Sequence, residues 1–306
     1  MGQAFVLIDL FANNILPPLL VMAAGYVLER AVGVDARSLS RVALYVFTPA
    51  LIFGSLIESE VPGSEFGLIA LFVILFMLIL WGVGLVVARL LHFDQKQTNA
   101  FLLATLFSNC GNYGLAVVLF AFGEQGLQRG LAYFITSAVL THTFAAYFAS
   151  RGTSTLRASV RNVLRLPLIY AVAVAVLLRL LEVRLPEFIM RAVNMPRAGA
   201  IPLLQLVLGV QLARISRRLD LRFVGTAASV QLLASAAVAF GLSAVLGLQG
   251  LTRQVTIVEA SMPAAVTILA LSLEFGTSPE EVGGVVFLST LLSPLTLTAV
   301  LALVQR

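Results

Sequence analysis

The sequence contains few charged residues for its length. Asp, Glu, Lys and Arg make up 11% of its 306 residues, whereas hydrophobic residues make up 59%. A soluble domain typically has about 25% charged residues, so this chain has too few to cover a water-exposed surface. The net charge of +5 comes mainly from arginines that lie between apolar segments, a distribution that does not favour nucleic-acid binding. The composition instead predicts a protein that lies in a lipid bilayer.

The residues that most often carry catalysis are scarce. The one cysteine, Cys110, excludes an intramolecular disulfide and a thiolate zinc cluster. The two histidines, His92 and His142, lie in different segments. No phosphate-binding P-loop, GxSxG or HExxH motif occurs, so neither ATP hydrolysis nor hydrolytic or metal chemistry is favoured. We therefore expect no enzymatic activity, no metal and no cofactor.

Long apolar segments follow one another along the chain. A helix needs about 20 mostly apolar residues to cross the hydrocarbon core of a bilayer. The N-terminus lacks the basic region and cleavage site of a signal peptide, so we interpret it as the first membrane helix. The predicted spans are 5–28, 39–57, 66–91, 98–121, 128–149, 163–182, 187–212, 222–247, 252–275 and 282–304.

The basic residues predict the orientation of these spans. Thirteen of the twenty Lys and Arg residues fall in the connections on one side. Short loops rich in Lys and Arg face the cytoplasm. We expect a multi-pass protein of the cell's inner (plasma) membrane with both termini outside.

The ten spans divide into two sets of five. Residues 150–162 form the most polar stretch and predict a boundary between a first repeat, 1–149, and a second repeat, 163–306. An odd number of spans in each half places the halves in opposite orientations, which is the inverted-repeat arrangement of many secondary transporters. The predicted fold is an all-α membrane protein of ten transmembrane helices in two inverted five-helix repeats, with broken crossover helices 4 and 9.

Matching interruptions support the repeat. Pro49 in the second span and Pro202 in the seventh lie 153 residues apart, and the same offset carries Asn109 in the fourth span onto Met262 in the ninth. A helix is expected to break at both of these last positions. A chance match between prolines, which are common in membrane helices, is the alternative.

The fourth span contains the segment SNCGNYGLA at residues 108–116. Gly111 and Gly114 weaken helical order, while the side-chain oxygens of Asn109 and Asn112 can cap the start of a helix. We expect two half-helices to meet here, with exposed N–H groups and a positive dipole end directed into the protein.

The ninth span contains EASMPAAVT at residues 259–267. Pro263 lacks the N–H of a continuous helix, and Ser261 is expected to cap a second half-helix in which proline occupies the first turn. If the two breaks cross, their helix ends create a polar pocket that suits a small anion. Kinked helices without a ligand are the alternative. The predicted substrate-binding residues are Asn109, Gly111, Asn112, Gly114, Ser261, Met262, Pro263 and Gln205.

Two ionisable residues inside predicted spans are candidates for ion or proton coupling. Glu259 lies near the middle of the ninth span, where a charge is costly and usually functional. It is interpreted either as a proton-coupling or cation-binding group, or as a neutral carboxyl hydrogen-bonded to a neighbouring helix. His142 is interpreted as a proton relay or as an interhelical hydrogen-bond partner. Gln205 joins the predicted pocket because it lies three residues past Pro202.

Four motifs together resemble the auxin efflux carrier family of bacteria and plants. They are SNCGNYGLA in the fourth span, EASMPAAV in the ninth, LYVFTPALIF in the second and FLSTLLSPLTL in the last, and the resemblance covers essentially the whole chain. The family pattern in the fourth span is Asn-x-Gly-x-x-Gly-x-Pro. Asn109, Gly111 and Gly114 match this pattern, and Ala116 replaces its final proline.

The resemblance implies a scaffold formed by spans 1, 2, 6 and 7, which would also build a homodimer contact. Spans 3–5 and 8–10 would move as a unit in an elevator-like cycle of alternating access. Family members are associated with organic anions such as auxin or dicarboxylates, so we expect a carrier for a small organic anion or weak acid. A sodium- or proton-coupled symporter of the same fold is one alternative, and a membrane ligand sensor without transport is another.

Overall fold

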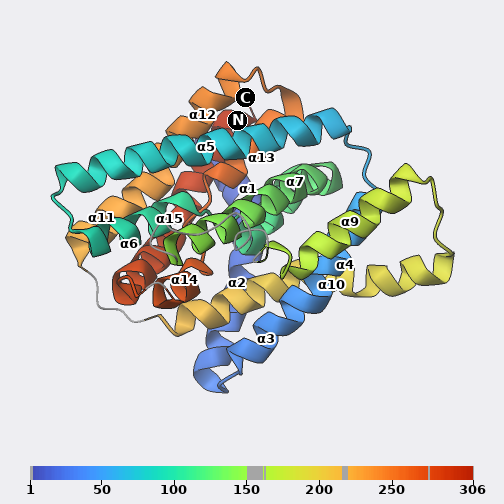
Figure 1. The fold of residues 1–306 in the computed structure, drawn as a ribbon, viewed down its shortest axis with the longest axis horizontal. Coiled ribbons are helices and arrows are strands. Elements are labelled where there is room, and N and C mark those ends of the chain that lie inside the picture. The colour runs from blue at the N-terminus through green and yellow to red at the C-terminus, as the bar shows by residue number, and fades with distance from the viewer. Residues whose placement is uncertain (1–2, 150–160, 162, 216–219, 275, 306) are drawn as a thin grey trace.

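The computed structural model describes residues 3–149, 161, 163–215, 220–274 and 276–305 (Figure 1). Across these residues the chain is helical, and its one extended pairing is an isolated antiparallel bridge between Ser108 and Ala264. The predicted all-α class is therefore confirmed. The polar boundary predicted at 150–162 lies outside the described residues, apart from Arg161.

The helices of the first half correspond closely to the predicted spans. Short π-helical turns join several of them into longer helices. They are α1 (Gln3–Leu10), η1 (Phe11–Ile15), α2 (Leu16–Ala31), α3 (Ala36–Val42), η2 (Ala43–Phe47), α4 (Thr48–Ile57), α5 (Gly63–Leu90), α6 (Gln95–Leu106), η3 (Cys110–Gly114) and α7 (Leu115–Ala149).

The second half continues in the same way, with π-helical residues again inside one of its long helices. Its elements are α9 (Pro167–Leu180), α10 (Glu187–Ala213), α11 (Leu221–Ser229), η4 (Val230–Ala234), α12 (Ser235–Val245), α13 (Gly250–Ala260), α14 (Ile268–Glu274) and α15 (Pro279–Val304).

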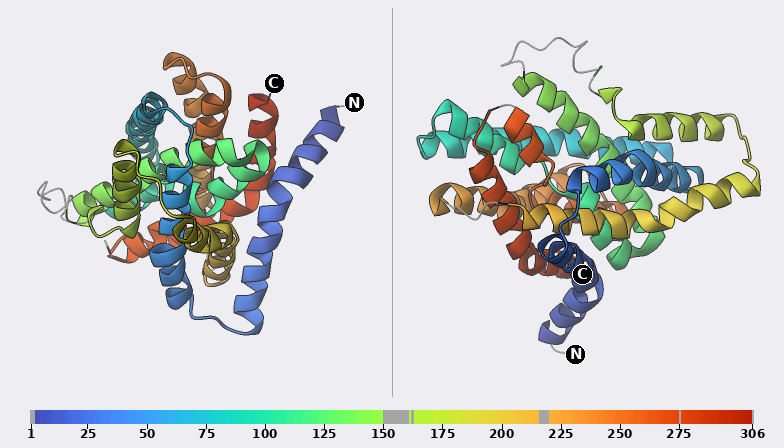
Figure 2. Two further views of the ribbon diagram at one scale, coloured as in Figure 1. Left: turned by 90° about the vertical axis from the view of Figure 1, so that its right-hand side faces the viewer. Right: turned by 90° about the horizontal axis from the view of Figure 1, so that it is seen from below.

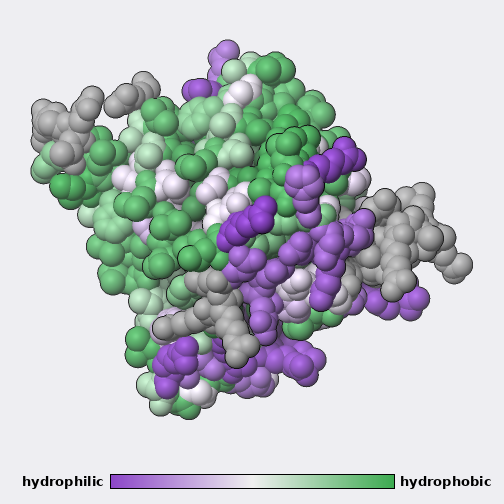
Figure 3. Space-filling view, turned by 90° about the vertical axis from the view of Figure 1, so that its left-hand side faces the viewer, coloured by the Kyte–Doolittle hydropathy of each residue, from purple (hydrophilic) through white to green (hydrophobic). Residues whose placement is uncertain are grey.

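Six helices in the described part of the chain are long and apolar enough to cross a membrane. They are Phe5–Ala31, Ala36–Ile57, Gly63–Leu90, Glu187–Ala213, Leu221–Val245 and Pro279–Val304. On the face in Figure 3, hydrophobic residues cover most of the surface and hydrophilic residues gather on its lower and right-hand parts. An apolar exterior of this kind suits contact with lipid acyl chains.

The other four predicted spans differ from simple membrane helices. The fourth and ninth are interrupted, since α6 ends at Leu106 and α13 ends at Ala260. The element labelled α7 consists of two helices that meet at a kink at Gly123, whose φ is 66° and ψ is −163°, so the fifth span starts after Gly123, close to its predicted start at 128. The sixth, α9, has 14 residues and starts at Pro167, which fits the first helical turn.

The closest helix packing joins α2 to α10. A Cβ atom built on Gly25 would lie 2.3 Å from the carbonyl oxygen of Leu206, and one on Gly209 would lie 1.9 Å from that of Met22. The backbones therefore touch at both glycines. Small residues allow this approach, which is how membrane helices gain van der Waals contact without help from the hydrophobic effect.

The helices form two groups by their contacts. One group consists of α2, α4, α9 and α10, with α3 packed against it. The other contains α5, α6, α7, α11, α12, α13 and α15. In Figure 1 the first group lies mainly at the lower right, α5 runs across the upper part of the molecule, and α6 and α11 lie at the left. Figure 2 places the two chain ends on the same side of the molecule, where α1 runs beside α15.

Candidate functional site

The two interrupted helices meet at their breaks. After α6 ends, Phe107 is extended, and its carbonyl oxygen accepts a hydrogen bond of 2.9 Å from the backbone N–H of Ala265. The N–H of Asn109 donates in turn to the carbonyl oxygen of Pro263 at 2.7 Å. Backbone groups inside a membrane protein must find internal partners. Each break supplies partners for the other, so neither interruption depends on water for these bonds.

Side chains from three other helices form hydrogen bonds with the backbone at the breaks. Gln205 on α10 donates from Nε2 to the carbonyl oxygen of Asn112. Gln231 in η4 donates to the carbonyl oxygen of Met262 at 2.9 Å. The hydroxyl of Ser289 on α15 accepts from the backbone N–H of Ala264 at 3.2 Å. These residues hold the interrupted backbone in place.

The predicted helix caps are wrong in detail. Asn109 precedes η3, yet its side chain makes no capping hydrogen bond. Ser261 ends α13 instead of starting a new helix, because its hydroxyl donates back to the carbonyl oxygen of Ile257 at 2.7 Å. Pro263 does not lie in a first helical turn, since α14 begins only at Ile268. The link between α13 and α14 is held by hydrogen bonds to other segments, which local sequence rules do not describe.

Glu259 lies at the end of α13, fully buried. A Cβ atom built on Gly114 would lie 2.0 Å from its Oε2, and one built on Gly130 would lie 2.9 Å from its Oε1. The carboxyl group therefore occupies the space left by two glycines of η3 and α7. Neither oxygen has a hydrogen-bond partner among the described residues. The predicted alternative of a carboxyl bonded to a neighbouring helix is not what this geometry contains.

Other buried polar atoms around the breaks also lack partners within the described chain. They are Nδ2 of Asn109, Oε1 of Gln205 and Oε1 of Gln231. Buried polar atoms are nearly always hydrogen-bonded, and leaving one unpaired costs free energy. A group of such atoms on segments that meet, beside an unpaired carboxyl, marks a place where a polar ligand, an ion or water can bind.

Three predicted site residues contribute no side-chain atom to this group of unpaired polar atoms. Gly111 packs against Phe134, because a Cβ atom there would lie 2.5 Å from the ring of that residue. The side chain of Asn112 is only half-buried, and its backbone carbonyl makes the contact with Gln205. His142 is twelve residues beyond Gly130 on α7, which at ~1.5 Å per residue puts it about 18 Å away along the helix. The structure therefore does not bring His142 to the carboxyl of Glu259.

The predicted site did not include three residues of this region. Gln231 could have been found, since a glutamine within an apolar span signals an internal hydrogen bond. Tyr113 lies inside the glycine-containing segment and carries a buried hydroxyl. The hydroxyl of Ser289 bonds within α15, to Val286, but also holds the break. No group of three or more His, Cys, Asp or Glu side chains able to hold a metal ion occurs in the part of the chain that the structure describes.

Comparison with known proteins identifies the class. A family model described as membrane transport protein matches two successive segments, residues 10–151 and 150–301. The chain belongs to this family, the auxin efflux carrier family, and the resemblance drawn from its motifs is thus confirmed. It is a multi-pass membrane protein of a transporter family, and this membership indicates transport rather than catalysis.

Two archaeal proteins are similar over most of the chain. An uncharacterized transporter of Methanothermobacter thermautotrophicus is 30% identical over 293 residues, which cover 93% of this chain and 95% of the relative. An uncharacterized transporter of Methanocaldococcus jannaschii is 24% identical over 271 residues, covering 86% of this chain and 87% of the relative.

Proposed function

We propose that this protein is a secondary carrier that moves a small organic anion or weak acid across the cell's inner membrane. The observation that carries the proposal is the meeting of the two helix breaks at Asn109 and Pro263, surrounded by buried polar atoms without partners among the described residues. Family membership supports transport over the alternative of a ligand sensor.

The chemistry of the breaks favours an anion. A helix that begins at an interruption directs the positive end of its dipole at that point, which favours a nearby anion. The amide Nδ2 of Asn109 adds a buried donor that is unpaired within the described chain. In this proposal Asn109, Gly111, Asn112, Gly114, Ser261, Met262, Pro263 and Gln205 form the substrate site.

The fold proposed for this function has ten transmembrane helices in two inverted repeats, 1–149 and 163–306. Its crossover helices are the fourth, formed by α6, η3 and the part of α7 before Gly123, and the ninth, formed by α13 and α14. The family model's matches to 10–151 and 150–301 support two repeats. Both termini are proposed to lie outside, and α2, α4, α9 and α10 to form a scaffold that also supports a homodimer.

Substitution of Asn109 tests the site. Asn109→Ala removes a buried donor that has no partner among the described residues, so the protein should fold and insert normally but lose uptake of organic acids into liposomes. The matched control is Asn13→Ala, since Asn13 is exposed and its side chain donates to Asp9 at the surface. Normal flux in Asn109→Ala would remove this residue and the proposed site from the mechanism.

Movement between the two helix groups is the second element of the proposal. Arg197 on α10 pairs with Glu124 on α7 at 2.6 Å and so joins the groups, whereas Arg214 and Glu29 pair at 2.8 Å within one group. An elevator-like cycle must separate the first pair and leave the second intact.

Cross-linking distinguishes the two pairs. The double variant Glu124→Cys with Arg197→Cys, joined by a short cleavable thiol reagent, should stop transport until the bridge is cleaved. The double variant Glu29→Cys with Arg214→Cys should continue to transport when joined. The native Cys110 is buried and should not react under the same conditions. Undiminished flux after cross-linking at positions 124 and 197 would contradict a relative movement of these groups.

Proton coupling is favoured over simple uniport by the position of Glu259. An ionised carboxyl beside a bound anion would repel it strongly in a region of low dielectric, so anion binding favours a protonated Glu259. A sodium-coupled symporter is the competing version, and flux with either a proton or a sodium gradient separates them.

A further inference from the structure

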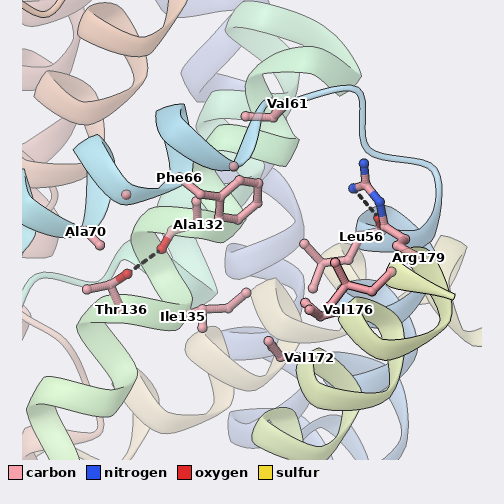
Figure 4. Close-up of a pocket in the computed structure, with 13 residues that line it drawn as sticks. Leu56, Val61, Phe66, Ala70, Ala132, Ile135, Thr136, Val172, Val176 and Arg179 are labelled. Atoms are coloured by element: carbon pink, nitrogen blue, oxygen red, sulfur yellow. Dashed lines mark hydrogen bonds between the residues drawn. The ribbon is translucent and has the colours of Figure 1, made fainter.

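A cavity of about 640 Å³ lies apart from the helix breaks, between α4, α5, α7 and α9 (Figure 4). Its walls include Leu56, Phe66, Ala70, Ile135 and Val176. A separate layer of buried residues, including Leu51, Leu115 and Leu131, packs in the same region of α4 and α7. None of the residues that line the cavity is among those of the proposed substrate site.

The cavity is apolar with one cationic end. Thr136 is part of the lining, but its hydroxyl already donates to the carbonyl oxygen of Ala132 at 2.9 Å. The charged side chain in the lining is that of Arg179. Figure 4 shows its guanidinium at one side of the cavity, where Nη1 donates to the carbonyl oxygen of Leu56 at 2.9 Å.

Arg179 has capacity to bind an anion. A guanidinium has five N–H donors, and within the described chain Arg179 uses one of them on a carbonyl oxygen. Four other arginines pair with carboxylates, whereas Arg179 has no carboxylate within ion-pair distance among the residues described. Those paired arginines are Arg129, Arg191, Arg197 and Arg214.

The cationic end lies where helices terminate. Arg179 is the penultimate residue of α9, Leu56 is the penultimate residue of α4, and α5 starts at Gly63. From Gly63 to Ala70 the lining follows α5 for about 10 Å, at ~1.5 Å per residue. The cavity thus extends from the level of the helix ends inward along α5, and its rim residues Val176 and Leu180 are 44% and 76% exposed.

We propose that this cavity seats an anionic phospholipid, with its phosphate on Arg179 and one acyl chain along the apolar walls. An exposed apolar rim in a membrane protein faces acyl chains, so a lipid reaches the cavity directly from the bilayer. Basic groups between membrane helices at the headgroup level bind such phosphates, and guanidinium matches phosphate geometry. The bound lipid would contact both helix groups.

Two variants separate the phosphate contact from the acyl-chain contact. Arg179→Gln keeps a hydrogen-bond donor for Leu56 but removes the charge, and exposed Arg184 in the following connection gives the matched control Arg184→Gln. Gly67→Leu fills the cavity, because a Cβ atom on Gly67 meets nothing within 4 Å. Gly82→Leu is its control, since Gly82 lies on the same helix in equally open space outside the lining.

Native mass spectrometry of the purified full chain with added phosphatidylglycerol or phosphatidylcholine reads out binding. The wild type and both controls should retain phosphatidylglycerol in preference to phosphatidylcholine. Arg179→Gln and Gly67→Leu should each reduce that retention by about tenfold, a change equivalent to about 1.4 kcal/mol.

Three results would overturn the proposal. If Arg179→Gln retains as much phosphatidylglycerol as the wild type, Arg179 does not bind the phosphate. If Gly67→Leu retains as much as the wild type, the acyl chain does not bind in this cavity. A water-soluble aromatic carboxylate is added to the wild type and to Arg179→Gln at the same concentrations. If it displaces phosphatidylglycerol from the wild type but does not change the phosphatidylglycerol retained by Arg179→Gln, the occupant would be a soluble acid instead. This experiment measures lipid binding and not transport. A negative result would therefore contradict the lipid site without bearing on the proposed transport function.

Discussion

Glycine has opposite roles in two regions of this protein. Between α2 and α10, Gly25 and Gly209 bring backbones into contact and leave no space. At the helix breaks, Gly114 and Gly130 leave space that the carboxyl of Glu259 fills. The first contact involves backbone atoms that cannot move independently, whereas the second involves the end of a flexible side chain. The contact between α2 and α10 is therefore suited to a rigid scaffold, and the helix breaks are suited to a site that binds and releases a ligand.

The largest effect is expected at the backbone contact. Gly209→Leu would place side-chain atoms where the Met22 carbonyl lies, so α2 and α10 must separate. Overpacking costs about 1–3 kcal/mol in ordinary cores and occasionally more, and here backbone must shift. We expect little monodisperse protein by size-exclusion chromatography. Gly241→Leu, in open space on α12, should purify like the wild type. Full recovery of Gly209→Leu would mean that the close contact is dispensable.

An intermediate effect is expected at the carboxyl. In Gly114→Ala the new methyl group displaces Glu259, whose side chain can turn away, so the fold should survive. Transport should fall by about tenfold or more, or about 1.4 kcal/mol in the barrier. Gly225→Ala on α11, where nothing lies within 4 Å, is the control. The comparison between the two regions fails if Gly114→Ala unfolds the protein as severely as Gly209→Leu.

The smallest expected change is one of pH dependence. Glu259→Gln preserves the shape of the side chain but cannot gain or lose a proton. If the carboxyl couples protons, liposome flux measured at a series of pH values should become flat, and a proton gradient should no longer drive accumulation. Glu187→Gln, which also loses a carboxyl but at an exposed ion pair within α10, should keep the wild-type profile. An unchanged profile in Glu259→Gln would make this residue structural.

The sequence alone determined that the protein is helical and lies in a membrane, because a chain with 11% charged residues cannot form a water-exposed surface. It also located the interruptions near Asn109 and Pro263, since glycine and proline disfavour a continuous helix wherever they occur. Helix ends were predicted within a few residues for most spans. These features depend on local composition and need no knowledge of neighbours.

Only the tertiary structure decided what the interruptions do. The capping roles expected of Asn109 and Ser261 were wrong, because the freed backbone groups pair across two segments more than 150 residues apart in sequence. The sequence also did not reveal the hydrogen bond from Gln231 to Met262, 31 residues away, or the contact of Glu259 with Gly114 and Gly130. Hydrogen bonds and steric contacts between remote segments depend on which helices become neighbours, and residue type alone does not determine that.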